Sequence, residues 1–203
     1  MTGSVEADLP LEATLRRAAQ GDQEAWRLLV ERYTPRVFGL LLKQCSDREL
    51  AEEITQATFV AVVTKLADGY DERGRFESWL FRIAMNALRD EMRRRKRQAV
   101  VMEMTPATAQ DEQANTWASA QNGLSELPHE QLIHQEQIAQ MRQAVAKMNE
   151  ADREILHLRH TADLSFAQIA EVLDQPLGTV LARCHRALGK LRKLLHDSDR
   201  HSI

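Results

Sequence analysis

Residues 77–98 read ESWLFRIAMNALRDEMRRRKRQ, a stretch that starts with spaced apolar residues and ends in a run of cations. A helix advances about 100° per residue, so its apolar positions gather on one side: Leu80, Ile83, Ala84, Ala87 and Leu88. The opposite side carries Arg82, Asn86, Arg89 and Arg93. We therefore predict a helix with one face packed in a core and one cationic face that includes a single amide.

The cationic face of this helix is suited to a nucleic acid strand. Arginines neutralise phosphates, and an asparagine side chain can form two hydrogen bonds with a base edge. The neighbouring Phe76, Trp79 and Phe81 could stack on unpaired bases, although aromatic residues at helical spacing more often pack in a core. For the arginines, the alternative is a solvated helix end that the helix dipole favours.

The composition indicates a globular protein of one or two domains. The chain has 203 residues, 43% of them apolar, and a net charge of −3. Its longest apolar run is far shorter than the roughly 20 residues of a membrane span, and its first residues lack the cations of a secretory signal. Cys45 and Cys184 are too far apart in the sequence to form a closely spaced cysteine motif. We expect a cytoplasmic protein without a membrane segment or a disulfide framework.

Helical periodicity recurs along the chain and strand patterns are almost absent, which predicts an all-α fold. Asp22 is a predicted helix cap, and Ser46 with Glu49 forms a capping-box pattern before the next helix. Residues 98–141 contain no Lys or Arg and six acidic residues, with prolines and small polar residues among them. The predicted organisation is a small helical domain at 1–99, an acidic flexible linker at 100–133 and a second small helical domain at 134–203.

The second domain contains a helix-turn-helix pattern. Ser165 and Gln168 form a capping box before a short helix, and a tight turn leads into a long basic helix. One stripe of the long helix is polar and basic: Thr179, Arg183, Arg186 and Lys190. The other is predicted to pack: Val180, Cys184, Ala187, Leu188 and Leu191. Such a helix could lie in the major groove of duplex DNA, although helix pairs with basic ends also occur in plain bundles.

One candidate metal motif is present. Glu154 and His157, with His160 one turn further on, match half of a helical di-iron site. The second half would need another Glu-x-x-His helix, and the other match, Glu126 to His129, contains a proline. The sequence also lacks a phosphate-binding glycine loop, a nucleophile elbow and a zinc-spaced Cys/His set. We therefore expect no metal, no cofactor and no catalytic residue.

Four stretches together resemble the extracytoplasmic-function (ECF) sigma factors of bacterial RNA polymerase, members of the sigma-70 family. They read GDQEAWRLLVERYTPRVFGLL (21–41), AEEITQATF (51–59), GRFESWLFRIAMNALRDEMRRRKR (74–97) and LSFAQIAEVLDQPLGTVLARCHRAL (164–188). The resemblance covers nearly the whole chain and implies two helical modules, regions 2 and 4, that dock on the polymerase and direct it to promoters.

The resemblance also assigns roles to residues. The helix of AEEITQATF implies contacts of Glu53, Gln56 and Phe59 with the clamp helices of the polymerase β′ subunit, with Phe59 as a core residue the alternative. Asn86 matches the position that captures a flipped base of the melted minus-ten element. The second module implies reading of the minus-thirty-five element and contact with the β flap, and the acidic linker resembles a segment threaded through the polymerase channels. An anti-sigma factor is a candidate further partner.

The recognition helix departs from the family pattern. Leu181 and Ala182 stand where relatives commonly have a cation and a serine. Relatives also tend to contact DNA through positions 182, 185 and 186. This adds His185 to the candidate residues, and only Arg186 belongs both to this set and to the polar stripe predicted from helical spacing. The resulting hypothesis is a promoter-specificity subunit without an active site. The alternatives are a helix-turn-helix regulator that works without polymerase and, in another class, a helical metal-dependent enzyme.

Overall fold

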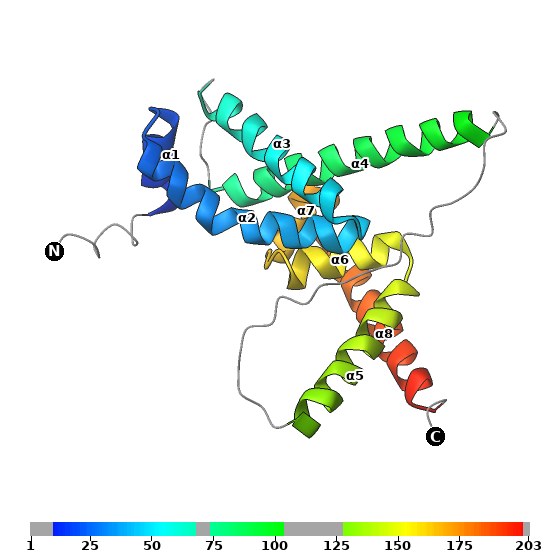
Figure 1. Cartoon of the computed structure of the whole chain (residues 1–203). Coiled ribbons are helices and arrows are strands. Elements are labelled where there is room, and N and C mark those ends of the chain that lie inside the picture. The colour runs from blue at the N-terminus through cyan, green and yellow to red at the C-terminus, as the bar shows by residue number, and fades with distance from the viewer. Residues whose placement is uncertain (1–9, 68–73, 104–127, 201–203) are drawn as a thin grey trace.

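A computed structural model describes residues 10–67, 74–103 and 128–200 of the chain. All regular secondary structure in these ranges is helical, which confirms the all-α prediction (Figure 1). The helices are α1 (Leu11–Ala19), α2 (Gln23–Cys45), α3 (Arg48–Ala67), α4 (Phe76–Glu103), α5 (Pro128–Ala146), α6 (Glu150–His160), α7 (Phe166–Leu173) and α8 (Leu177–Arg200). Residues 104–127 of the predicted linker lie outside the described residues, whereas its two ends, 100–103 and 128–133, are helical and belong to α4 and α5.

The junction of α1 and α2 forms as the sequence predicts. Gly21 adopts φ +86°, a conformation that glycine reaches without strain, and this ends α1. The Asp22 carboxylate then accepts hydrogen bonds from the backbone N–H groups of Glu24 and Ala25, at 2.9 and 3.2 Å. These bonds satisfy two of the free donors at the start of α2.

The predicted capping box at Ser46 and Glu49 is wrong. Ser46 has φ 56° and donates its backbone N–H to Leu42, so it ends α2 in the left-handed region. The next residue, Asp47, accepts a hydrogen bond from the backbone N–H of Leu50 at 3.0 Å and caps α3. A Ser-Asp pair offers two possible caps, and the tight turn between the helices selects the second one.

Helices α2, α3 and α4 pack around an aromatic core. Tyr33, Phe76 and Phe81 are fully buried, and the rings of Tyr33 and Phe76 meet edge to face with centroids 5.4 Å apart. On α4, Leu80, Ala84 and Leu88 are buried as predicted, and Ile83 and Ala87 are partly buried. Because the apolar stripe of α4 packs in the core, the cationic stripe on the opposite side of the helix faces away from the core.

Helices α6, α7 and α8 form the predicted helix-turn-helix unit, with α5 packed beside α8. The Ser165–Gln168 capping box is present at the start of α7. Asp174, with φ 52°, ends α7 in the left-handed region, and α8 begins three residues later. Val180, Cys184 and Ala187 are buried on α8 as predicted, whereas Leu188 is 41% exposed, so its assignment to the packed stripe is wrong. Leu188 lies at the edge of that stripe and no neighbouring helix covers it fully.

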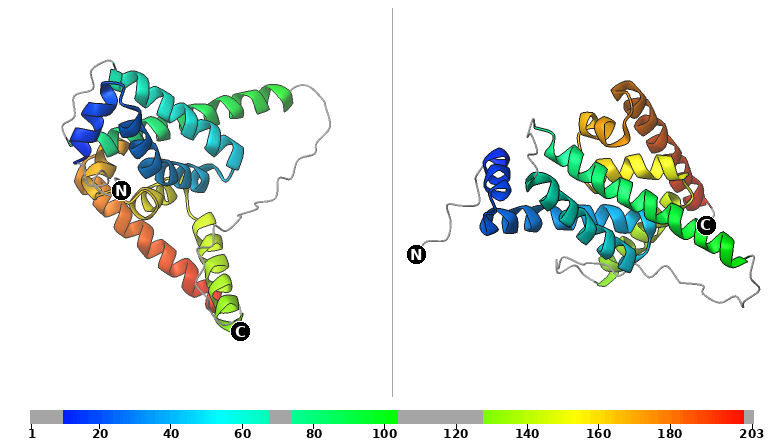
Figure 2. Two further views of the ribbon diagram at one scale, coloured as in Figure 1. Left: turned by 60° about the vertical axis from the view of Figure 1, so that its left-hand side comes forward. Right: turned by 90° about the horizontal axis from the view of Figure 1, so that it is seen from above.

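The two helical units lie against each other. Helix α7 contacts α4, and α6 contacts α2 (Figure 2). Glu77 of α4 is at the centre of this contact: it accepts hydrogen bonds from Arg36 of α2 (2.7 Å), Tyr33 of α2 (3.2 Å) and Gln168 of α7 (2.9 Å). Burial raises the pKa of Glu77, but these hydrogen bonds outweigh it and hold the pKa below its usual value.

Candidate nucleic-acid interface

The cationic face of α4 is largely exposed. Arg82, Asn86 and Arg93 are exposed, and Arg89 is partly buried. Within the described ranges, Arg82 makes no ion pair with an acidic side chain. The exposed guanidinium of Arg82 and the exposed amide of Asn86, on adjacent turns, carry the kinds of group that bind phosphate and base atoms.

Arg89 connects this face to the second helical unit. One of its Nη atoms donates to Asn86 Oδ1 at 3.0 Å, and the other forms an ion pair with Glu154 of α6. Glu154 is largely buried. In this arrangement Arg89 is held by protein groups, and it can reach a nucleic acid strand only after the contact with α6 opens.

The aromatic residues near this face pack in the core. Phe76 and Phe81 are buried, and Trp79 is partly buried with its ring centroid 5.9 Å from that of Phe76. Arg36 lies over the ring of Phe81, 5.4 Å from its centroid. Phe76 and Phe81 are therefore unable to stack on bases in this conformation, and the core alternative holds for them.

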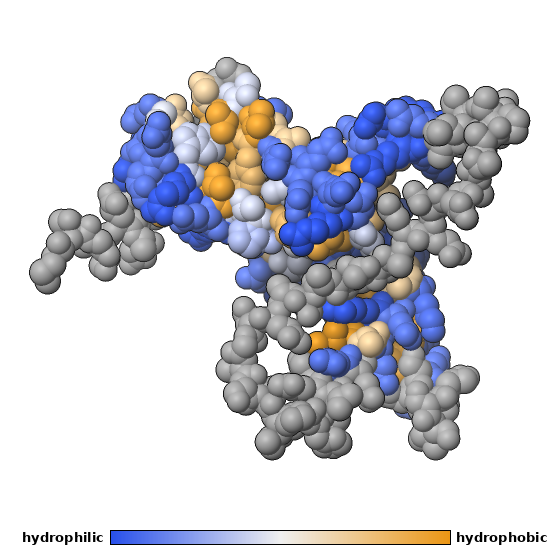
Figure 3. Space-filling view, in the orientation of Figure 1, coloured by the Kyte–Doolittle hydropathy of each residue, from blue (hydrophilic) through white to orange (hydrophobic). Residues whose placement is uncertain are grey.

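Residues 93–97 of α4 are all cationic and exposed, and this part of the helix is strongly hydrophilic in Figure 3. Arg94 and Arg95 both bond to Glu91, and these bonds lower the pKa of Glu91 to about 2. Arg95 also pairs with Asp47 at 2.8 Å. This pair joins the C-terminal part of α4 to the residue that caps α3.

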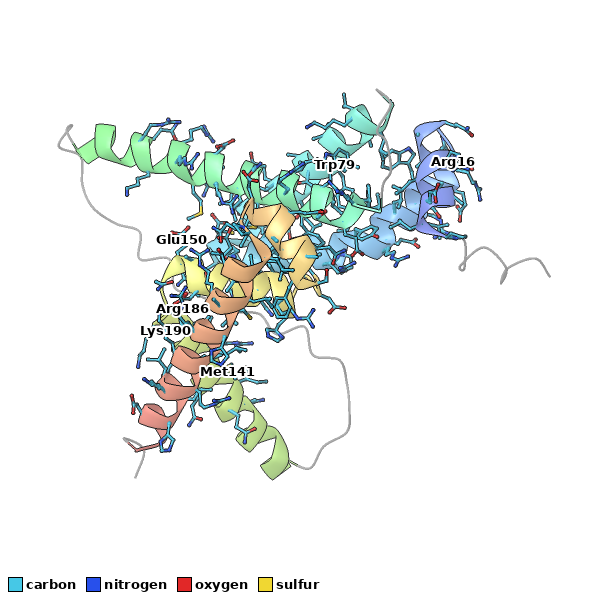
Figure 4. All side chains as sticks on the ribbon, turned by 180° about the vertical axis from the view of Figure 1, so that it is seen from behind. Arg16, Trp79, Met141, Glu150, Arg186 and Lys190 are labelled. Atoms are coloured by element: carbon cyan, nitrogen blue, oxygen red, sulfur yellow. The ribbon has the colours of Figure 1, made fainter. Side chains whose placement is uncertain are left out.

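The predicted DNA-binding residues of α8 have unequal surroundings. Thr179, His185 and Arg186 are exposed, and Arg183 is partly buried with its Nη1 donating to Gln175 Oε1 at 3.3 Å. Lys190 forms an ion pair with the buried carboxylate of Asp152 on α6. Figure 4 shows Arg186 and Lys190 along α8 beside the start of α6.

The α3 surface that was predicted to dock on polymerase is also exposed. Glu53 and Gln56 are exposed, whereas Phe59 is partly buried and packs against the core. Two valines outside the predicted contact set lie beside them: Val60 is 67% exposed, and Val63 is also exposed. Val60 and Val63 follow Gln56 by four and seven residues, so all three lie on one side of the helix. This helical spacing in the sequence is the feature from which the two valines could be predicted as part of the surface.

The candidate metal residues do not form a metal site. Glu154 is paired with Arg89, and His160 is exposed. Burial, with the positive charges of Lys43 and Arg153, lowers the pKa of His157 to about 4. Among the described residues, no group of three His, Cys, Asp or Glu side chains is placed to hold a metal ion.

Both helical units match known protein families. The sigma-70 region 2 model matches residues 29–98, and the sigma-70 region 4 model matches residues 144–193. The ECF RNA polymerase sigma factor SigW of Bacillus subtilis (strain 168) is 27% identical over 190 residues, which cover 94% of this chain and 99% of SigW. The RNA polymerase sigma factor NccH of Alcaligenes xylosoxydans xylosoxydans is 32% identical over 193 residues, 92% of this chain and 95% of NccH. This chain belongs to the sigma-70 family, in its ECF group.

Two solved structures share the fold of this sigma factor. CnrH, in complex with the cytosolic domain of CnrY, has a TM-score of 0.64 and 23% identity, covering 95% of this chain and 99% of CnrH. The sigma factor RpoE of Bartonella quintana, in complex with the anti-sigma factor NepR, has a TM-score of 0.64 and 20% identity, covering 84% of this chain and 96% of RpoE.

Family membership fixes the class of function. Sigma factors are transcription initiation factors that act with RNA polymerase on promoter DNA, and they are not enzymes. Membership in this family therefore contradicts the metal-dependent enzyme and favours a factor that acts with polymerase over a regulator that works without it. In the described parts of the chain, no helix has the length and apolar content that crossing a membrane requires.

Proposed function

We propose that this ECF sigma factor binds core RNA polymerase and directs it to promoters by reading two DNA elements in different states. The first unit (1–99) reads the minus-ten element as a melted strand, and the second (134–203) reads the minus-thirty-five element as duplex. Residues 104–127, between α4 and α5, connect the two units in this proposal. The observation that carries this proposal is the outward cationic face of α4 with an amide within it.

The face of α4 is suited to an unpaired strand. Arg82 and Arg93 attract phosphates, and Asn86 binds the edge of a base that has left the stack. Arg89 joins this surface when its ion pair with Glu154 opens. A duplex hides the Watson–Crick edges of its bases, so an amide that binds such an edge favours the melted strand.

The outer face of α8 is suited to a duplex. Arg186 is exposed, and it belongs both to the polar stripe predicted from helical spacing and to the positions through which relatives tend to contact DNA. It is therefore the first candidate to bind the edge of a guanine. Thr179, Arg183 and His185 flank it, and Lys190 is placed to approach a phosphate if it also keeps its bond to Asp152. The N-terminal half of such a helix enters the major groove.

The exposed row on α3 is the proposed polymerase contact. Glu53 and Gln56 supply polar groups for the β′ clamp helices, and the exposed Val60 adds apolar area beside them. Phe59 supports this surface from below, because it packs against the core. The second unit contacts the β flap in the same proposal.

The compartment and one further partner follow from the same proposal. RNA polymerase works in the cytoplasm of bacteria, so we place this sigma factor there. RpoE of Bartonella quintana has been solved with an anti-sigma factor, and a similar partner is proposed for this chain.

The test of this function is reconstitution. The purified chain is mixed with core RNA polymerase and a library of promoter fragments, and the transcripts are sequenced. We expect transcription from a defined subset of fragments that share two spaced elements. Binding to duplex DNA without any association with core polymerase would contradict the proposal.

A further inference from the structure

The first turn and a half of α8 carries no charged side chain. Residues 177–182 read LGTVLA, and the first cation is Arg183. Leu177 is 47% exposed and Leu181 is 43% exposed, and in this segment only Val180 is buried. Two large apolar side chains are therefore open to solvent in the half of the helix that the proposed function places in the major groove.

These leucines belong to the same surface as the predicted DNA-binding residues. Leu177, Leu181 and His185 follow each other at intervals of four residues, so they form one row on the helix. His185 is exposed, and so is Arg186 next to it in the sequence. The leucine row is thus continuous with the proposed duplex-reading surface.

The major groove offers one feature that binds such a row. Thymine presents its C5 methyl group there, and apolar side chains contact this methyl, whereas guanine, cytosine and adenine present hydrogen-bonding groups. The N-terminal residues of a recognition helix contact base edges. The cations of α8 begin at Arg183, one turn further on, where they can bind phosphates on either side of the groove.

We propose that Leu181, assisted by Leu177, makes this sigma factor read thymine methyl groups in the minus-thirty-five element. The inference rests on the proposed function and adds its base specificity. When α8 enters the groove, thymine methyl groups are buried against Leu181. The apolar surfaces of the leucine and of the methyl group are both removed from water, which favours binding. At this position the chain places a leucine, whose side chain gains from contact with a methyl group and offers no hydrogen bond.

Uracil substitution isolates the methyl group, because uracil differs from thymine only by its absence. A promoter obtained by selection with the reconstituted holoenzyme is prepared with thymine or with uracil at the minus-thirty-five element alone. We expect the wild-type holoenzyme to lose about fourfold in promoter affinity for each contacted methyl, the equivalent of one buried carbon. Equal affinity for the two templates would overturn the inference, as would a selected element made only of G·C pairs.

Two variants locate the effect. Leu181→Ala should lose affinity for the thymine template and show no further loss on uracil. Leu188→Ala, which removes a leucine of similar exposure from the same helix, should keep the wild-type preference for thymine. Both positions are exposed, so both variants are expected to fold, and circular dichroism checks this. A Leu181→Ala protein that retains the full thymine preference would also overturn the inference.

The outcomes separate this inference from the proposed function. A holoenzyme that transcribes selected promoters without regard to the methyl groups retains the function and loses the inference. A chain that fails to associate with core polymerase loses both.

Discussion

The two predicted DNA-binding surfaces each have one cation bound to a carboxylate of α6, and the two ion pairs differ in what they join. Arg89 pairs with Glu154 across the contact between the two helical units. Lys190 pairs with Asp152 inside the second unit. Separation of the units releases Arg89 and leaves Lys190 in place. The surface for the melted strand is therefore sensitive to the arrangement of the units, and the surface for the duplex is not.

The largest expected effect concerns α6 itself, which carries both carboxylates. His157 has a pKa of about 4 in the fold and about 6.5 when unfolded. Above pH 6.5 both states are neutral and the effect is absent. As the pH falls below 6.5, the unfolded chain takes up the proton first, so the fold loses stability, by about 2 kcal/mol at pH 5.

The measurement is the free energy of unfolding in urea at pH 7 and pH 5, for the wild type and for His157→Gln. The variant cannot titrate at this position, so its loss of stability between the two pH values should be smaller. Identical losses would show that His157 is not kept neutral beside Lys43 and Arg153.

The second prediction is that Arg186→Ala weakens promoter binding about tenfold, because a charged contact with a base edge is lost. Arg186 is exposed, so the stability of the chain should stay within about 0.5 kcal/mol of the wild type. Holoenzyme binding to a promoter fragment and urea unfolding measure the two quantities. A loss of stability without a loss of promoter binding would show that Arg186 has a structural role and does not contact DNA.

Lys190→Ala should show the reverse pattern. It leaves the buried Asp152 with fewer partners, and the half-exposed position of Lys190 limits the loss of stability to about 1 kcal/mol. Base preference in promoter selection should not change, and the salt dependence of binding should fall slightly if a phosphate contact is lost. A changed base preference would contradict this assignment.

The smallest effect is expected at the contact between the units. Glu154→Gln removes the charge that holds Arg89, so the chain should bind a single-stranded minus-ten oligonucleotide about threefold more tightly. Glu31→Gln is the matched control, because it removes the same charge from an exposed site on α2. Fluorescence anisotropy gives both affinities, and equal values would show that Glu154 does not restrain Arg89.

Local patterns in the sequence were sufficient to predict the helices and to predict which face of α4 is buried and which is exposed. The apolar spacing of Leu80, Ala84 and Leu88 determines which side of α4 is buried, and therefore predicts the exposure of Arg82 and Asn86. The capping box at Ser165 was also predictable, since its partners are three residues apart.

The contacts between distant residues were not predictable in this way. Arg89 and Glu154 are separated by 65 positions, and Lys190 and Asp152 by 38. No periodicity relates such residues, because they meet only through the packing of whole helices. For the same reason Leu188 was assigned to the packed stripe, although the neighbouring helices leave it exposed.

The most direct test of the account is Asn86→Ala in the reconstituted holoenzyme. Permanganate reactivity of unpaired thymines reports promoter melting, and nuclease protection of the minus-thirty-five element reports duplex binding. The account predicts a loss of melting of about tenfold or more, with association with core polymerase and protection of the minus-thirty-five element unchanged. Unchanged melting, or an equal loss of all three signals, would contradict the reading of a melted strand by α4.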